Sequence, residues 1–113
     1  MLINKELLKG STVTLILKLI NKKPMYGYEM IKEMDEKSKG VFTLKEGTLY
    51  PILHTLEANG LVEAYWDEES SKRKRKYYRI TKEGKSSLKE KEEEWATFRS
   101  AVDNMLLEAI SWA

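Results

Sequence analysis

The 113-residue sequence contains no cysteine, only two prolines and a single histidine, His54. Without cysteine, the chain can form neither a disulfide framework nor a thiolate zinc site. No second histidine and no cluster of carboxylates stands at ligand spacing around His54, so the sequence predicts no metal site. A nucleophile paired with a base, a glycine-rich phosphate loop and a pair of catalytic carboxylates are also missing. This argues against an enzyme, and we expect no catalytic residue and no cofactor.

Long apolar runs are absent as well. No stretch approaches the ~20 apolar residues that are needed to span a bilayer. The first ten residues hold only a short apolar patch before Asn4, Lys5 and Glu6, unlike a secretory signal. We therefore expect a cytoplasmic protein without a membrane partner.

Charged residues are abundant, at 34% of the chain, but they almost balance to a net charge of +2. Residues 70–85 nevertheless carry eight positive charges against one negative charge, while residues 1–69 and 86–113 are both net negative. Within the basic segment the chain reads SKRKRKYYRI, in which a run of cations leads into a strand-like alternation. Cations that a strand holds in a row suit the regularly spaced phosphates of a nucleic acid. Double-stranded DNA is therefore the expected partner.

Apolar periodicity predicts three helices ahead of the basic segment. Residues 5–21 are apolar on more than one face and should form a largely buried helix that Asn4 caps. Pro24 follows its end, and Gly40 should end a second helix. A third helix is predicted within residues 44–60, where Pro51 removes one hydrogen bond and leaves the start of the helix as its least defined boundary.

The outward face of the third helix carries short or planar polar groups. Such groups near the start of a helix suit the major groove of DNA. They are Glu46, Thr48, Tyr50 and His54. The same residues are also typical of an ordinary exposed helix surface, and the nearby basic segment is what favours contact with DNA.

Residues 61–69 and 75–81 alternate like two strands around a turn at 70–74. Three helices followed by a hairpin within about 80 residues are typical of a winged helix-turn-helix. The expected fold class is thus mainly α with a small β-hairpin. Residues 1–82 would form the DNA-binding domain, with the hairpin as its wing.

The cations of the wing are the predicted phosphate contacts. Charge runs are usually solvated surfaces, but clustered cations repel one another unless something neutralises them. The predicted contacts are Arg73, Lys74, Arg75 and Lys76. Tyr77 and Tyr78 fall on opposite faces, so that one should pack on the core and the other should face DNA. The alternation does not say which.

Residues 83–113 are predicted to form one long helix that Thr81 caps. Apolar residues recur along it at spacings of three, four or seven, which is the pattern of two helices packed together. A lone helix would leave these side chains in water, so we expect a homodimer. The predicted dimer interface consists of Leu88, Trp95, Phe98, Val102, Met105, Ala109 and Trp112.

Four segments resemble the PadR family of transcriptional regulators. They are LLKGS at 7–11, PMYGYEMIKEM at 24–34, EGTLYPILHTLEANGLVEAYW at 46–66 and KRKYYRITKEG at 74–84. The resemblance implies a bacterial or archaeal homodimer, usually a repressor, that binds an inverted repeat through its winged helix. The single short last helix is similar to the compact branch of the family, which includes multidrug-responsive repressors.

The resemblance also implies which residues face DNA. They lie near the first helix, at the start of the second helix, on the third helix and in the wing: Lys9, Gly10, Tyr26, Tyr28, Glu46, Thr48, Tyr50, His54, Lys74, Arg75, Lys76, Tyr78 and Arg79. The family often has a Gly-Gly pair in the wing turn, where this chain has Ser70-Ser71-Lys72-Arg73. Roles of turn residues are therefore not carried over.

The resemblance leaves two interpretations of Trp95. In multidrug-responsive relatives, a tryptophan at a similar place stacks on planar drugs between the two subunits. A cavity for a planar apolar or cationic ligand would then be lined by Leu8, Leu15, Phe98 and Val102. An aromatic residue at this spacing more often fills a dimer core. Two other functions also stay open: a winged-helix module that binds an acidic protein, and a drug sensor whose DNA binding is secondary.

Overall fold

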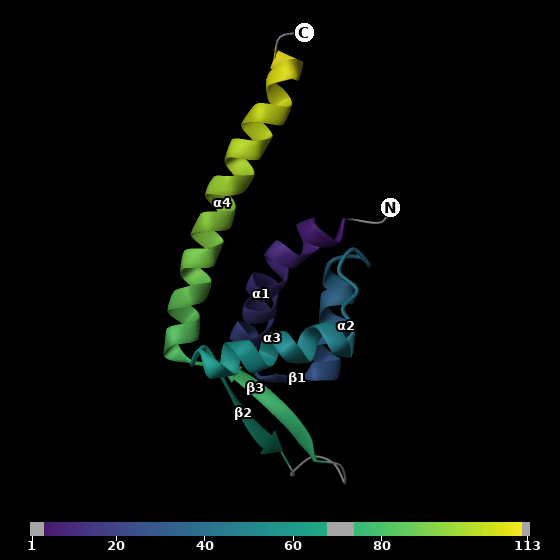
Figure 1. Cartoon of the computed structure of the whole chain (residues 1–113), viewed down its shortest axis with the longest axis vertical. Helices are drawn as coiled ribbons and strands as arrows, with labels where there is room; N and C mark the ends of the chain where they lie inside the picture. The colour runs from purple at the N-terminus through teal and green to yellow at the C-terminus, as the bar shows by residue number, and fades with distance from the viewer. Residues whose placement is uncertain (1–3, 68–73, 112–113) are drawn as a thin grey trace.

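The computed structural model describes residues 4–67 and 74–111, in which four helices surround a small antiparallel sheet (Figure 1). The elements are α1 (Lys5–Lys22), β1 (Met25–Tyr26), α2 (Gly27–Lys37), α3 (Glu46–Ala58), β2 (Val62–Asp67), β3 (Arg75–Ile80) and α4 (Lys82–Ser111). The predicted class, mainly α with a small hairpin, is confirmed. The fold is a winged helix-turn-helix body that continues into one long helix.

The first two helices begin at caps that lie within a few residues of each start. The Asn4 side chain accepts a hydrogen bond from the Glu6 amide at 2.8 Å, as the sequence predicted. At the start of α2, the Glu29 carboxylate accepts one from the Tyr26 amide at 3.3 Å. After α2 the backbone turns through a left-handed Gly40, at φ +82°. This agrees with the predicted stop, within the usual uncertainty of helix ends.

Pro51 lies inside α3, and the helix starts well before it. The Lys45 carbonyl accepts from the amides of Thr48 and Leu49, at 3.0 and 2.9 Å, so the first turn is closed ahead of the proline. Proline has no N–H to offer the carbonyl of Gly47, four residues back. The cost of Pro51 is thus confined to the first turns of α3.

The sheet has three strands in the order β1-β3-β2, one more than the sequence predicted. β1 pairs antiparallel with β3, opposing Met25 to Tyr78 and Tyr26 to Tyr77. A strand of two residues is too short to show an alternation of polar and apolar residues. The strand therefore joins the start of α2 to the base of the wing in a way that pattern reasoning could not detect.

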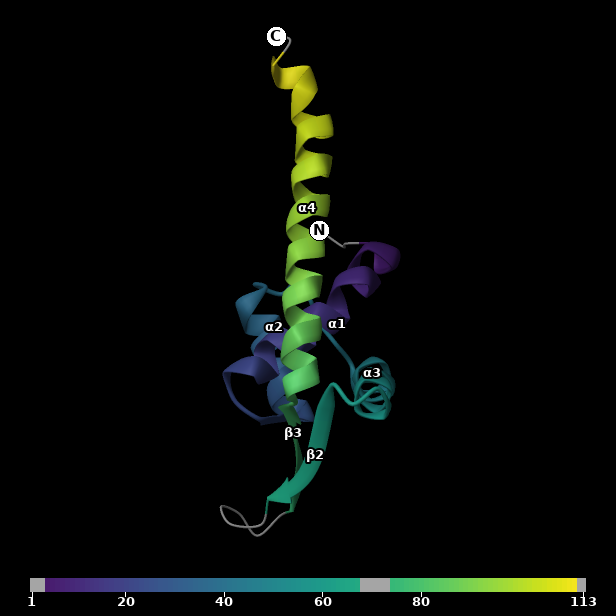
Figure 2. The same ribbon diagram turned by 90° about the vertical axis from the view of Figure 1, so that its left-hand side faces the viewer.

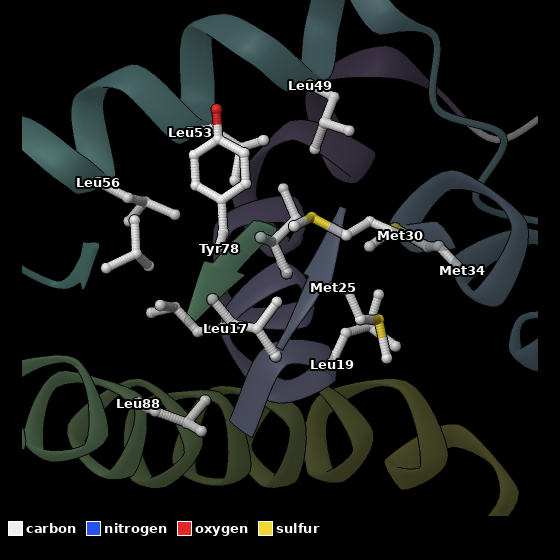
Figure 3. Packing of buried hydrophobic residues seen from close by; sticks show 13 residues of the cluster. Leu17, Leu19, Met25, Met30, Met34, Leu49, Leu53, Leu56, Tyr78 and Leu88 are labelled. Carbon is white, nitrogen blue, oxygen red and sulfur yellow. The ribbon is translucent and has the colours of Figure 1, made fainter. Parts of the chain in front are cut away.

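The core lies between the helices and one face of the sheet (Figure 3). Leu49, Leu53 and Leu56 reach into it from α3, and Met30 reaches in from α2. Tyr78 enters from β3 with its hydroxyl directed toward α3 (Figure 3). α4 closes the core from the opposite side with Leu88, which is only 3% exposed.

α4 begins at Thr81, the predicted cap, whose side-chain oxygen accepts from the Gly84 amide at 3.0 Å. The Thr81 hydroxyl also donates to the Gly60 carbonyl at 2.7 Å, which ties the start of α4 to the end of α3. From there α4 rises past the body, away from the wing (Figures 1 and 2). None of the described helices is both long and apolar enough to cross a membrane.

Leu88 was predicted to lie in a dimer interface, and this is wrong. The residue belongs to the buried core of its own chain, because the first part of α4 packs along α1. The Lys18 ammonium meets the Glu92 carboxylate at 3.3 Å, near the point where α4 leaves the body. The predicted domain boundary between residues 82 and 83 does not coincide with that point.

Candidate nucleic-acid interface

α3 presents one apolar side and one polar side. Its leucines are buried in the core, whereas the four residues predicted to face DNA are exposed: Glu46, Thr48, Tyr50 and His54. The first half of the helix therefore offers a carboxylate, a hydroxyl, a phenol and an imidazole to solvent. A single helix of this kind fits the major groove, where such groups can reach base edges and phosphates.

Tyr50 packs against the neighbouring helix as well as facing solvent. Its phenol lies so close to Gly27, the first residue of α2, that a Cβ at this glycine would overlap the phenol oxygen. Any side chain at Gly27 would push α2 and α3 apart. Tyr50 is 37% exposed, so it contributes both to the surface and to the angle between the two helices.

The two tyrosines at the start of α2 have different surroundings. Tyr28 is 63% exposed and remains a candidate for DNA contact. Tyr26 is half-buried, because its ring meets Tyr77 edge to face at 5.4 Å and the Arg75 guanidinium lies 4.6 Å from its ring centre. Tyr26 thus packs on the sheet.

The wing has two faces of different chemistry, because residues paired across antiparallel strands point to the same side. What we call the inner face consists of Val62, Ala64, Trp66, Lys76, Tyr78 and Ile80. What we call the outer face consists of Glu63, Tyr65, Asp67, Arg75, Tyr77 and Arg79. The inner face packs on the body at its base, and the outer face lies on the side away from the core.

Three tyrosine rings cross the sheet on the outer side, one from each strand. Tyr77 stands in the middle, stacked on Tyr65 at 5.7 Å and in edge contact with Tyr26. The guanidinium of Arg75 covers the Tyr26 ring, and that of Arg79 lies 4.7 Å from the Tyr65 ring centre. Cations placed over aromatic faces are attracted to them, so this row stabilises the twist and direction of the hairpin.

Arg75 and Arg79 were predicted phosphate contacts, and the structure places them away from the polar side of α3. Both lie on the outer face over tyrosine rings, and the Arg79 Nε is also 2.7 Å from the Glu63 carboxylate. These partners already occupy the two guanidinium groups. The structure therefore brings Arg75 and Arg79 together with the tyrosines that hold the wing.

Tyr78 was predicted to face DNA, and this is wrong. It is 1% exposed and packs beneath α3, because its position in β3 puts it on the inner face at the base of the wing (Figure 3). Burial raises the pKa of Tyr78, and the nearby Glu57 and Tyr50 side chains add to the effect. The choice between the two tyrosines is thereby settled: Tyr78 packs in the core, and Tyr77 stands in the row on the outer face.

The inner face continues beyond the body toward the tip of the wing. Lys76 lies there, half-buried, with its ammonium 5.7 Å from the centre of the Tyr78 ring. Lys74, two residues earlier on the chain, is exposed. Opposite Lys76 stands Trp66, which is 61% exposed. Sequence reasoning placed Trp66 on the same side as Val62 and Ala64 but missed that the strand leaves the body before reaching it.

The remaining predicted DNA contacts are more distant or outside the described residues. Lys9 and Gly10 are exposed on the first half of α1, at the end of the body opposite the wing (Figure 1). The structure does not bring them next to the wing cations. Arg73 lies outside the described residues. Within residues 4–67 and 74–111, no group of three His, Asp or Glu side chains could hold a metal ion.

The second half of α4 carries most of the predicted dimer contacts. Trp95, Phe98 and Met105 are 47%, 54% and 74% exposed, and Val102 is half-buried. The sequence did not single out two neighbours, Leu106 and Leu107, that are also largely exposed. The Ala109 side chain and the whole of Trp112 lie outside the described residues. This stretch of helix has no covering from its own chain over most of its apolar side chains.

The five residues proposed for a planar ligand do not enclose a site within one chain. Leu15 packs against the core and Leu8 is half-buried on α1, whereas Trp95 and Phe98 contact each other at 5.9 Å on α4. Beyond the contact of Lys18 with Glu92, α1 and α4 diverge (Figures 1 and 2). A cavity around Trp95 therefore requires a second molecule to close it.

Comparisons with known proteins agree on one family. The transcriptional regulator PadR-like family matches residues 16–90. An uncharacterised protein from Lysinibacillus sphaericus is 38% identical over 102 residues, which cover 90% of this chain and 94% of that protein. A transcriptional regulator from Clostridium thermocellum has a similar structure, with a TM-score of 0.82, 36% identity and coverage of 88% of this chain and 97% of that one. For a PadR-like transcriptional regulator from Bacillus cereus the TM-score is 0.81, with 32% identity and coverage of 90% and 97%.

Proposed function

The chain belongs to the PadR-like family of transcriptional regulators, and we propose that it acts as a homodimer that binds an inverted repeat in double-stranded DNA and represses a neighbouring gene. As a member of this family it is a DNA-binding regulator and no enzyme. The sequence specificity, the dimer and the repression are the parts that we propose.

One observation carries the proposal: the exposed polar side of α3 belongs to the same winged-helix body as a basic wing. Thr48 and His54 lie on α3, while Lys74 and Lys76 extend along the wing. In such an arrangement α3 reads base edges in the major groove, and the lysines neutralise phosphates without reading sequence.

The second half of α4 supports the dimer. Trp95, Phe98 and Met105 expose large apolar side chains to water in the single chain. Burying one such side chain is worth roughly 1.5–3 kcal/mol, so pairing with a second chain is strongly favoured. Two copies would then present two α3 helices to one duplex, which matches an inverted repeat whose half-sites lie about one turn, ~34 Å, apart.

A selection of genomic fragments on the purified chain tests the proposal. We expect the retained fragments to share an inverted repeat and to bind two chains per duplex. The logarithm of affinity should fall with the logarithm of salt concentration at a slope of about −0.9 per neutralised phosphate. Retention of no common sequence, together with a flat salt dependence, would favour the winged-helix module that binds an acidic protein.

Exposed aromatic rings on α4 raise the question of a ligand. We propose that Trp95 and Phe98 pack in the dimer interface, because their spacing is that of a helix seam and their rings already touch. The alternative is a site for a planar apolar or cationic ligand between the two chains. Quenching of tryptophan fluorescence by planar cationic dyes, lost in Trp95→Ala, would support the ligand site.

A further inference from the structure

Trp66 is an exposed aromatic residue that neither the fold nor the proposed dimer explains. Its side chain is 61% exposed, although its strand neighbours on the inner face, Val62 and Tyr78, are 2% and 1% exposed. Within the described residues its indole stacks on no other ring. The other large exposed side chains of α4 share a dimer seam, whereas Trp66 lies on the wing, at the other end of the molecule (Figure 1).

The register fixes the direction in which Trp66 points. The pairs Val62–Ile80, Ala64–Tyr78 and Trp66–Lys76 succeed one another along the inner face. At the base of this face the Tyr78 hydroxyl is directed toward α3 (Figure 3). Two residues further out, at about 3.3 Å per residue, the same face has passed the edge of the body. Trp66 therefore projects from the side of the wing that α3 covers at its base.

The charges around Trp66 favour a polyanion over an apolar protein surface. Lys76 stands directly opposite on the paired strand, at a cross-strand distance of about 5 Å. Lys74 follows on the same side, whereas the acidic groups of the hairpin, Glu63 and Asp67, lie on the outer face. An indole flanked by lysines presents an apolar plane and an N–H donor next to positive charge, which suits the sugars and phosphates of a nucleic-acid strand.

The position of Trp66 relative to α3 selects the groove. With α3 in the major groove, a hairpin that projects past the helix crosses one phosphate ridge and reaches the adjacent minor groove. That groove is about 6 Å wide, enough for an indole on edge but too narrow for a helix. Apolar side chains on β elements are known to enter minor grooves and to pack against the sugars and bases there.

We propose that Trp66 enters the minor groove beside the major groove that α3 occupies, with Lys76 holding the adjacent phosphate. This inference rests on the proposed function, since it requires that the chain bind duplex DNA through α3 and the wing. It adds a contact residue, a groove and a chemical role for the wing that are separate from the reading of bases by α3.

A fluorescence experiment tests the placement. The chain has three tryptophans, so the double variant Trp95→Phe/Trp112→Phe leaves Trp66 as the only one. The probe is an A·T-rich duplex of about 30 base pairs, roughly three helical turns, at low ionic strength, where non-specific binding suffices. We expect duplex binding to shield Trp66 from acrylamide, and netropsin, a minor-groove ligand, to restore its accessibility. In the matched variant Trp66→Phe/Trp112→Phe, the remaining Trp95 should be equally accessible with and without DNA.

An affinity measurement complements the shielding. Trp66→Ala should weaken duplex binding about tenfold, the usual effect of removing one well-packed aromatic contact. Because the side chain is exposed, the melting temperature and the sedimentation mass should stay those of the parent. If the parent binds DNA while Trp66 stays accessible, or stays shielded under saturating netropsin, the inference is wrong and the proposed function stands. A Trp66→Ala variant that binds like the parent or changes the mass would also overturn it. Absence of duplex binding by the parent would overturn both.

Discussion

The two halves of α4 share one apolar spacing but differ in what covers them. In the first half, Leu88 is 3% exposed because α1 and the sheet pack on it. In the second half, Phe98 and Met105 stand at the same kind of spacing and are 54% and 74% exposed. The pattern therefore reports that a helix face must be covered, but it does not report whether the same chain or another chain covers it.

The first half is also joined to the body by its backbone. The Thr81 hydroxyl bonds to the Gly60 carbonyl, and the Thr81 amide donates to the Leu61 carbonyl at 3.1 Å. The start of α4 is thus fixed to the turn between α3 and β2. Since α3 and β2 carry the candidate DNA interface, any rotation of the paired second halves would act on α3 and the wing through this junction.

The largest expected effect comes from removing the buried leucine of the first half. Leu88→Ala would leave a cavity between α4 and α1, and such substitutions cost about 2–5 kcal/mol of unfolding free energy. Urea unfolding followed by circular dichroism measures the loss. It should have the same size at every protein concentration, because the contacts are within one chain. Recovery of stability at high concentration would instead place Leu88 between chains and remove the distinction between the halves.

Gly84 tests how tightly the first half is fixed. A Cβ at this position would collide with the Leu61 carbonyl oxygen and the Ile80 side chain, neither of which can retreat easily. Gly84→Ala should therefore lower the unfolding free energy by about 1–3 kcal/mol, despite the better helix propensity of alanine. Gly47→Ala is the matched control, because it is also helical and its Cβ would meet nothing within 4 Å. It should be neutral or raise stability by up to about 1 kcal/mol. Equal effects of the two substitutions would contradict the close packing at Gly84.

The second half should respond differently to the same kind of truncation. Phe98→Ala removes an exposed ring, so the unfolding free energy of the single chain should change by about 0.5 kcal/mol or less. The dimer should instead dissociate about tenfold more readily, as expected for one interface aromatic. Sedimentation equilibrium at several concentrations measures this directly. Lys89→Ala, an exposed substitution on the first half of α4, provides the control and should leave the mass unchanged. An undisturbed dimer in Phe98→Ala would show that another surface pairs the chains.

The sequence predicted the elements well where each had its own local cause. Asn4, Gly40 and Thr81 mark helix boundaries through their own caps or turns, and the structure confirms them. β1 was missed because two residues carry no pattern, and its existence depends on pairing with β3.

The candidate site was predicted less completely, for the same reason. The polar side of α3 follows from helical periodicity alone. The roles of Tyr78, Arg75 and Arg79 depend instead on which face of the hairpin meets the body and on which rings lie beside each guanidinium. Both are three-dimensional facts, since a strand alternates equally well in either orientation. Trp66 escaped notice because its alternation is that of a core residue and only the length of the hairpin exposes it.

The smallest expected effect lies at the border between the two halves of α4. Lys18 and Glu92 pair at 3.3 Å with their side chains 59% and 46% exposed, so Lys18→Ala should cost only about 0.2–1 kcal/mol of unfolding free energy. The loss should disappear in high salt, which screens an exposed pair but leaves the cavity effect of Leu88→Ala unchanged. Urea titrations of both variants at low and high salt make the comparison. If Lys18→Ala were as damaging as Leu88→Ala, the ion pair would be the attachment of α4. We expect instead that apolar packing and the Thr81 junction hold the first half, and that the ion pair only marks where α4 becomes free to meet a second chain.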